Sequence, residues 1–508
     1  MNSWKALAGL FTLFMVPRLL MLGDARWTGE ESWFFSQIHA TGQGLRWSAL
    51  GTPVSGTHGS HPGPYFYWLL APFSLGASPW LVSFAVALFD SLGHLLALAG
   101  LKRLWGEGEK QRLALGIATG LLALSPWALL YADRPWNSNL VSLPVGLALF
   151  GLASWWRNGG LTGFLCLTAG LAVLPSFHLS APILGLPMLL AVASRWRLLN
   201  HRSVLAGAML STLIWAPYLS HEWENSAANT RALLSRSLPS VSSPSNTLLA
   251  LSWPLRLVAP EIGYHAQKGY WSPYQPGAWT RPDSSAGSAW HRVHTSLALP
   301  GILLGLGLAF ASLGWWLFGL RRRKNRDLFA FVLTVGTLSG WMLLLIAGRR
   351  AYPHYLHPLL PFYAGAFGLG LAELCRPGRW RALLLGAFVV QLFSGVVVSA
   401  RFQSENDQQF GLNANLYTLE LIRRFGDVKP YFCGALGYRS SNQLKGIAEV
   451  SHAGLRLDGK AFSLVHALPG NLPDHLIKMA SWRQKIHGVE HFLIEGALPE
   501  SWRRVGCR

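Results

Sequence analysis

Apolar runs and short polar gaps alternate along residues 1–400 of this 508-residue chain. A transmembrane helix needs about 20 mainly apolar residues. The pattern therefore predicts an all-α polytopic membrane protein with about eleven transmembrane helices, with ends defined to about four residues. We expect these helices at 5–22, 79–101, 113–131, 139–156, 161–177, 180–194, 203–219, 296–320, 328–347, 356–374 and 382–400.

Basic residues collect in every second gap between these helices. Short cytoplasmic loops are enriched in Lys and Arg, so these gaps predict the inner side, with the N-terminus inside as well. The first apolar run has no small-residue cleavage site, and we interpret it as a retained helix of a bacterial-type inner or plasma membrane protein. The inner residues are Lys102, Arg103, Lys110, Arg112, Arg157, Arg195, Arg197, Arg202, Arg321, Arg322, Arg323, Lys324, Arg326, Arg376, Arg379 and Arg381.

The same topology places the other gaps and the C-terminal tail outside. We expect a membrane domain over 1–400 and a small extracytoplasmic α/β domain over 401–508, with a helix near 413–425 and strands at 431–436, 462–467 and 492–494. Cys433 and Cys507 fall in this tail, where they either form a disulfide or stay unpaired. The outer loops of the membrane domain are 23–78, 132–138, 220–295 and 348–357.

The amino-acid composition agrees with a membrane protein and affects how the positive net charge is interpreted. Hydrophobic residues make up 51% of the chain and charged residues only 13%, which is not typical of a water-soluble surface. The net charge of +20 would suit nucleic acid if it lay on one soluble face. Most of it lies in interhelical loops, where it orients the chain and meets anionic headgroups. We therefore expect membrane lipids, and not nucleic acid, as partners.

The first outer loop carries adjacent carboxylates, Glu30 and Glu31, at the start of an aromatic-rich helix. In one interpretation they complement the dipole of this helix. In the other, one of them points into a cavity and acts as a general base. On the same helix we expect Trp33, Phe34 and Ile38 to lie at the membrane interface.

Three further outward segments carry polar residues in a characteristic order. His61-Pro62-Gly63-Pro64 forms a rigid turn, Tyr131-Ala132-Asp133-Arg134-Pro135-Trp136-Asn137 follows the third helix, and Arg349-Arg350-Ala351-Tyr352-Pro353-His354-Tyr355-Leu356-His357-Pro358 precedes a late helix. Together with Glu30-Glu31, over about residues 5–400, this order resembles the protein O-mannosyltransferase and aminoarabinose transferase superfamily, which has the C-type glycosyltransferase (GT-C) fold. Each motif is loose, and their order and common side carry the resemblance.

The resemblance implies an inverting hexosyl- or pentosyltransferase. Its donor would be a sugar on a polyprenyl phosphate in the bilayer, and its acceptor an extracytoplasmic lipid, glycan or protein. We find no GxGxxG after a strand and no Walker loop, which agrees with a donor other than a nucleotide sugar. A transporter or flippase of a lipid-linked or polar envelope substrate is the alternative, although it would need polar groups across the membrane. A non-catalytic assembly protein is a third.

Site residues follow from this chemistry. The family usually has Asp first in the carboxylate pair, so the base stays open between Glu30, Glu31 and Asp24. Arg349 and Arg350 run against the inner bias of basic residues, and they either bind the lipid phosphate or extend to headgroups. Catalytic candidates are Glu30, Glu31 and Asp133, and substrate-binding candidates are Asp24, His61, Arg134, His178, Arg349, Arg350, His354 and Tyr355.

The roles of some buried polar residues have alternatives. His178 either lines the pocket or is a histidine whose hydrogen bonds are satisfied between helices. Asp90 lies inside a span, and we expect it to form a hydrogen bond with a neighbouring helix. Glu30, Glu31 and Asp133 with His61 could hold a divalent metal ion, although no spacing requires one. The central spatial prediction is that Glu30, His61, Asp133 and Arg350 converge on one outward cavity.

Overall fold

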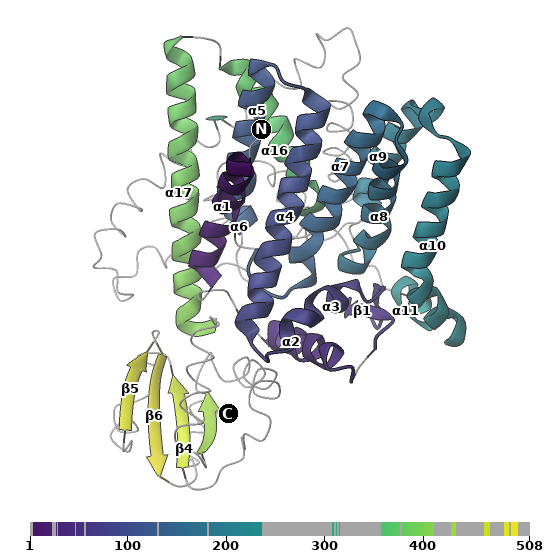
Figure 1. Cartoon of the computed structure of the whole chain (residues 1–508). Coiled ribbons are helices and arrows are strands. Elements are labelled where there is room, and N and C mark those ends of the chain that lie inside the picture. The colour runs from purple at the N-terminus through teal and green to yellow at the C-terminus, as the bar shows by residue number, and fades with distance from the viewer. Residues whose placement is uncertain are drawn as a thin grey trace.

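The structure is a computed structural model (Figure 1) in which a bundle of long helices is followed by a small sheet. Most of the residues that the structure describes are helical, as the apolar pattern predicts. The residues that the structure describes are 4–22, 27, 29–45, 47–54, 57–129, 132–179, 182–235, 307–308, 311, 314, 357–375, 378–410, 428–432, 462–467, 482–486 and 489–495.

The centre of the bundle is built from helices that pack along each other in pairs. Helix α4 (Pro79–Trp105) packs on α7 (Ser142–Asn158), α7 on α8 (Leu161–Phe177), and α5 (Glu109–Leu124) on α16 (Leu360–Leu374).

At the α4–α7 crossing the two backbones touch. A Cβ atom at Gly146 would overlap the carbonyl group of Gly93. Small residues at such crossings let helices approach closely where the surrounding lipid provides no hydrophobic driving force.

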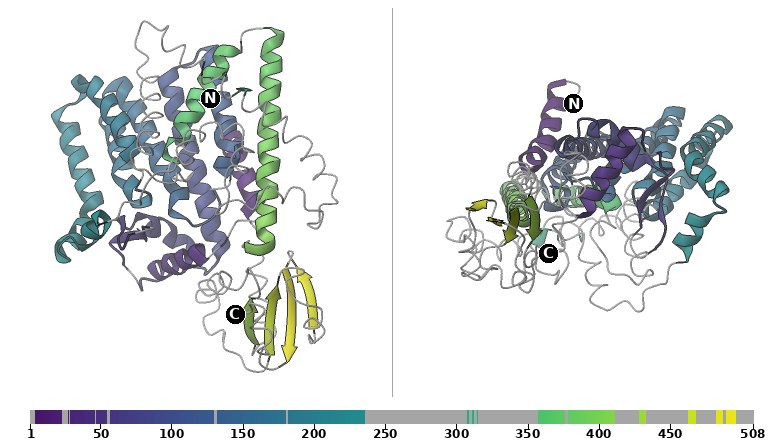
Figure 2. Two further views of the ribbon diagram at one scale, coloured as in Figure 1. Left: turned by 180° about the vertical axis from the view of Figure 1, so that it is seen from behind. Right: turned by 90° about the horizontal axis from the view of Figure 1, so that it is seen from below.

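Helices α1 (Trp4–Met21), α6 (Pro126–Leu129), α9 (Pro182–Ser194), α10 (His201–Glu224) and α17 (Arg379–Phe410) complete the part of the bundle that the structure describes. Helices α17 and α10 stand at opposite edges of it, as the views from the front and from behind agree (Figures 1 and 2).

The outermost helices present apolar side chains outward. Leu213 on α10 is 68% exposed, and Phe393 on α17 is 63% exposed. In water these side chains would be costly, whereas a bilayer solvates them. Four described helices are long and apolar enough to cross a membrane, at Pro79–Trp105, Asn137–Asn158, His201–Glu224 and Arg379–Val396. The protein is therefore a membrane protein.

The expected number of spans stays a prediction. Of the segments 296–320 and 328–347, all but residues 307, 308, 311 and 314 lie outside the described residues. Helix α8 has the predicted bounds, whereas α17 continues to Phe410 and so crosses the predicted domain boundary at 400/401. Hydropathy detects only the apolar part of a helix, and no Pro or Gly interrupts the polar residues 401–410.

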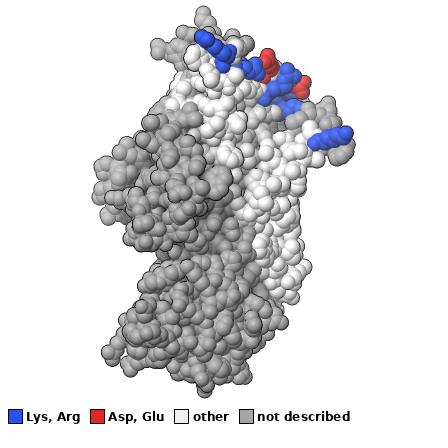
Figure 3. Space-filling view, turned by 90° about the vertical axis from the view of Figure 1, so that its left-hand side faces the viewer, with Lys and Arg blue, Asp and Glu red and all other residues white. Residues whose placement is uncertain are grey.

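Basic side chains gather at one end of the bundle, and the described part of the face below them shows no charged side chains (Figure 3). This is the end where α4 meets α5 and α16 meets α17. Lys110 forms an ion pair with Glu373, and Arg381 lies 2.7 Å from Glu109. These described basic residues thus lie at one end of the bundle, as the sidedness prediction requires. Residues 321–326 and Arg376 lie outside the described residues, and the orientation in the membrane stays a prediction.

The first loop forms a layer at the opposite end (Figure 1). It consists of α2 (Gly29–Gly42), an antiparallel hairpin of β1 (Leu50–Pro53) and β2 (Ser60–Pro62), and α3 (Tyr65–Leu70). The expectation that Phe34 and Ile38 lie at the membrane interface is wrong. They are 2% and 0% exposed, because α3 packs on α2 and brings Phe66 onto Phe34.

The C-terminal region contains a four-stranded sheet of β3 (Val428–Phe432), β4 (Phe462–Ala467), β5 (Trp482–Ile486) and β6 (Val489–Glu495). Its order is β3-β4-β6-β5, with β3 and β4 parallel and the other pairs antiparallel. Strand β4 has the predicted bounds. The described residues do not include the helix expected near 413–425, nor Cys433 and Cys507. The α/β character of this domain therefore stays a prediction.

Candidate functional site

The start of α2 meets the loop that precedes α7. The Arg134 guanidinium donates from Nη1 to Glu31 Oε1 at 3.1 Å, and both residues are buried. The Trp136 indole Nε1 donates to Glu30 Oε1 at 3.3 Å, and the Arg134 guanidinium lies 4.8 Å from the centre of the Trp136 ring. The two motifs, about a hundred residues apart in the sequence, therefore form one site.

Local interactions hold the loop in this shape. The Trp136 amide donates to the Arg134 carbonyl at 2.7 Å, and Asn139 Nδ2 donates to the same oxygen at 3.0 Å. A 3-10 turn over Asn137–Val141 then leads into α7. This fold-back directs the side chains of Arg134 and Trp136 to the same neighbour, the first turn of α2.

The two adjacent carboxylates have different environments. Glu31 is 2% exposed and is held by Arg134, whereas Glu30 is exposed to solvent beside Trp136. Both lie in the first turn of α2, where they also complement the helix dipole. Glu30 is therefore accessible from outside the protein, while Glu31 is paired with the Arg134 guanidinium.

His61 is the buried centre of a second set of contacts. Its Nδ1 lies 3.2 Å from the Pro175 carbonyl oxygen, and its Nε2 lies 3.2 Å from Asn137 Nδ2. A carbonyl only accepts and an amide NH₂ only donates, so His61 is neutral, with its proton on Nδ1. Burial lowers the pKa of His61 to about 4, although the Pro175 hydrogen bond opposes this.

Asn137 joins His61 to the end of α8, because its Nδ2 also donates to the Phe177 carbonyl at 2.6 Å. His178 follows directly, and its ring centre lies 5.9 Å from that of His61. Asp133 is 1% exposed and lies next to Arg134 in the chain. The 132–137 loop thus connects the carboxylate pair on one side with the two histidines on the other.

A residue of the segment after α10 holds the hairpin that carries His61 in place. Asn229 on α11 (Ala228–Leu234) accepts from the Ser60 amide at 2.7 Å and donates to the Ser60 carbonyl at 3.0 Å. Glu222, at the end of α10, accepts from the amide of Thr230 at 2.8 Å and holds the first turn of α11. Sequence reasoning missed this clamp, because neither residue lies in a motif.

Of the predicted site residues, the structure pairs Glu31 directly with Arg134 and brings Glu30 to Arg134 through Trp136. It also places the rings of His61 and His178 side by side. Sequence reasoning missed Trp136 and Asn137 as site residues, although both lie in the segment 131–137. An indole and an amide beside an arginine are a signal that could have identified them as hydrogen-bond donors of the site. Convergence with Arg350 stays a prediction, because Asp24, Arg349, Arg350, His354 and Tyr355 lie outside the described residues.

Comparisons with known proteins identify the fold. No protein-family model matches the chain, and no curated protein matches it in sequence. The structure of ArnT from Cupriavidus metallidurans bound to undecaprenyl phosphate is similar over 97% of this chain and 98% of that one, with 11% identity and a TM-score of 0.50. The chain has the GT-C fold. The resemblance stated from the sequence is confirmed at the level of the fold.

Two further solved structures with a GT-C fold are similar but less closely superposed. Archaeal oligosaccharyltransferase AglB from Archaeoglobus fulgidus has 10% identity and a TM-score of 0.41, over 91% of this chain and 70% of that one. Arabinosyltransferase EmbB from Mycobacterium smegmatis has 13% identity and a TM-score of 0.40, over 92% of this chain and 44% of that one.

Inside this GT-C bundle, Asp90 on α4 bonds a neighbouring helix, as expected from the sequence. Its Oδ2 lies 2.9 Å from Nη2 of Arg18 on α1, and both side chains are buried. Sequence reasoning missed Arg18, although an arginine inside an apolar span is itself a signal. His94 and His357 lie beside Asp90, and this is where metal-ligating side chains group in the part of the chain that the structure describes.

Proposed function

We propose that this chain is an inverting glycosyltransferase that moves a hexosyl or pentosyl group from a polyprenyl-phosphate donor in the bilayer to an extracytoplasmic lipid, glycan or protein. The observation that carries the proposal is the contact between Glu30-Glu31 and Arg134-Trp136, at the end of the bundle opposite the basic turns. The fold shared with ArnT bound to undecaprenyl phosphate supports the class of donor.

Glu30 is the proposed base. The acceptor hydroxyl gives its proton to the Glu30 carboxylate while its oxygen forms a bond to the anomeric carbon of the donor sugar. The bond from that carbon to the phosphate oxygen breaks, and the phosphate keeps the electron pair. A single displacement of this kind inverts the anomeric configuration. Glu30 suits the role because it is exposed and because the Trp136 indole orients it.

Arg134 is the proposed partner of the leaving phosphate. Negative charge grows on the phosphate as the bond breaks, and a cation that is already oriented stabilises it without reorganisation. Glu31 and the Trp136 ring hold the guanidinium in place. We propose that Arg349, Arg350, His354 and Tyr355 complete the phosphate site, and that Asp24, Asp133, His61 and His178 line the acceptor side.

The test uses membranes of a deletion strain in which the chain or a variant is expressed. Radiolabelled sugars on undecaprenyl phosphate are supplied, and label in envelope lipids, glycans and proteins is counted. Loss of the base in Glu30→Gln lowers the rate of transfer by about 10²–10⁴-fold. Glu107→Gln, a matched change at an exposed residue of the basic end, leaves the rate unchanged. Full transfer by the Glu30 variant refutes the assignment of the base.

A further inference from the structure

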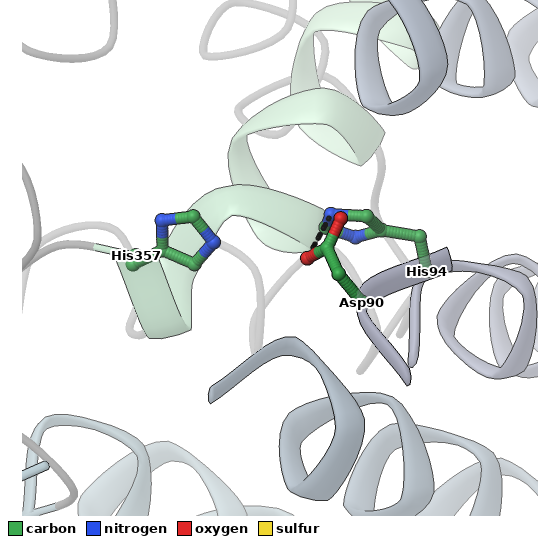
Figure 4. Close-up of side chains that lie close together, drawn as sticks. All are labelled: Asp90, His94 and His357. Atoms are coloured by element: carbon green, nitrogen blue, oxygen red, sulfur yellow. Dashed lines mark ion pairs between the residues drawn. The ribbon is translucent and has the colours of Figure 1, made fainter. Parts of the chain in front are cut away.

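A buried polar cluster lies inside the helix bundle (Figure 4). Asp90 and His94 stand one turn apart on α4, and His357 lies just before α16. One ligand atom from each residue falls within 4.8 Å of the others, and all three residues are 0–1% exposed. Two distant parts of the chain thus bring two imidazoles and a carboxylate to one point.

The hydrogen bonds of this cluster are incomplete on the side that faces His94. Asp90 Oδ2 accepts from the Arg18 guanidinium, from Nε at 3.0 Å. Asp90 Oδ1 lies 3.3 Å from His94 Nε2 without hydrogen-bond geometry, and neither ring nitrogen of His94 has a hydrogen-bond partner among the described residues. The 3.3 Å contact with Asp90 is thus the ion pair drawn in Figure 4, and it does not satisfy the His94 ring as a hydrogen bond would. In the interior of a membrane protein an imidazole without hydrogen bonds is costly, so these atoms suit a ligand.

We propose that Asp90, His94 and His357 bind a divalent transition-metal ion of the Zn²⁺ type. Two imidazoles and one carboxylate are a ligand set that such ions accept, with water in the fourth position. Zinc bonds of about 2.0–2.1 Å place tetrahedral ligand atoms roughly 3.3 Å apart, so small rotations of the side chains close the set. The ion would join α4 to the start of α16.

Arg18 lies next to the proposed metal site and affects how Asp90 can bind an ion. It holds Asp90 Oδ2 and leaves Oδ1 for the ion, which is the position that outer partners of metal-bound carboxylates take. Its other donors face the carbonyl groups of Phe14, Ala123 and Leu122. Because its positive charge opposes a second cation nearby, we expect binding weaker than in a closed site of thiolates.

The experiment uses the full chain, purified in detergent without a polyhistidine tag and stripped with a chelator. Co²⁺ is the probe, because its visible ligand-field bands report a site of nitrogen and oxygen ligands. We expect about one ion per chain from this three-ligand set. Mass spectrometry of the unstripped protein should find Zn²⁺ at the same ratio.

Single changes of the ligands decide the assignment. His94→Gln and His357→Gln leave the Arg18–Asp90 ion pair intact and should weaken Co²⁺ binding by about 100-fold or more. His39→Gln removes a histidine that bonds the Ser74 carbonyl outside the cluster, and it should bind Co²⁺ as the parent does.

Two results would overturn the proposal. One is a folded parent protein that shows no ligand-field bands and contains no zinc, in which case the cluster holds a water molecule. The other is equal binding by the parent and by both cluster variants, which would place the ion elsewhere. Size-exclusion profiles show which variants are folded. Sugar transfer is measured separately, so failure here leaves the proposed function untouched.

Discussion

The buried pair of Glu31 and Arg134 allows a quantitative test of the site. The two side chains are 3% and 6% exposed, and their charged atoms lie 3.1 Å apart. Removal of one partner leaves the other charge buried and uncompensated, which costs about 3–5 kcal/mol. Replacement of both by apolar groups of similar size removes that penalty, so a Glu31→Leu/Arg134→Met protein should lie within about 1 kcal/mol of the parent.

A double-mutant cycle isolates the interaction. Each single variant should lose about 3 kcal/mol, which is roughly a hundredfold in the unfolding equilibrium. Since the double variant should lie within about 1 kcal/mol of the parent, these losses correspond to a coupling energy of about 5 kcal/mol. The contribution of Trp136 to Arg134 cancels between the two arms. Unfolding is followed in mixed detergent micelles by the fluorescence of the 24 tryptophans.

The cycle also separates stability from function. The double variant should be stable yet inactive in sugar transfer, because the cation for the leaving phosphate is gone. Additive losses, with no coupling, would mean that the pair does not form and would remove the physical basis of the site. A stable and fully active double variant would leave the pair in place but refute the role of Arg134.

Three further predictions concern the surroundings of the site. The pKa of His61 is about 4 in the folded chain and 6.5 in the unfolded chain, so between these pH values the folded state binds fewer protons. The free energy of unfolding should therefore fall by up to about 3 kcal/mol as the pH drops from 6.5 to 4. In unfolding titrations, His61→Asn should abolish this dependence. Asn229→Ala removes both hydrogen bonds to β2, and it should lower the free energy of unfolding by about 1–3 kcal/mol and slow sugar transfer. Unchanged stability and an unchanged rate of transfer would show that these hydrogen bonds are dispensable. Gly146→Ala forces a methyl group into the α4 backbone and should cost about 2 kcal/mol, whereas Gly116→Ala, which meets nothing within 4 Å, should be neutral or slightly stabilising in the same unfolding assay.

Part of the site was predictable from the sequence. The carboxylate pair Glu30-Glu31 and the segment around Arg134 were expected on the same side of the membrane, and the structure places them in contact. Their roles stay predictions. The sequence did not indicate which glutamate would be buried, since adjacent residues of a helix point about 100° apart and only the neighbouring loop decides which of them is covered.

The amino-acid sequence by itself determined the helical membrane class, the grouping of basic turns at one end and the approximate helix bounds, because these depend on local hydropathy and charge. Only the tertiary structure decided the partners: Glu31 with Arg134, Arg18 with Asp90, and His357 with His94. Hydropathy shows how deep a side chain lies in the membrane. It contains no information on the direction around the helix axis in which that side chain finds its neighbour, and the packing of helices distant in sequence supplies that direction.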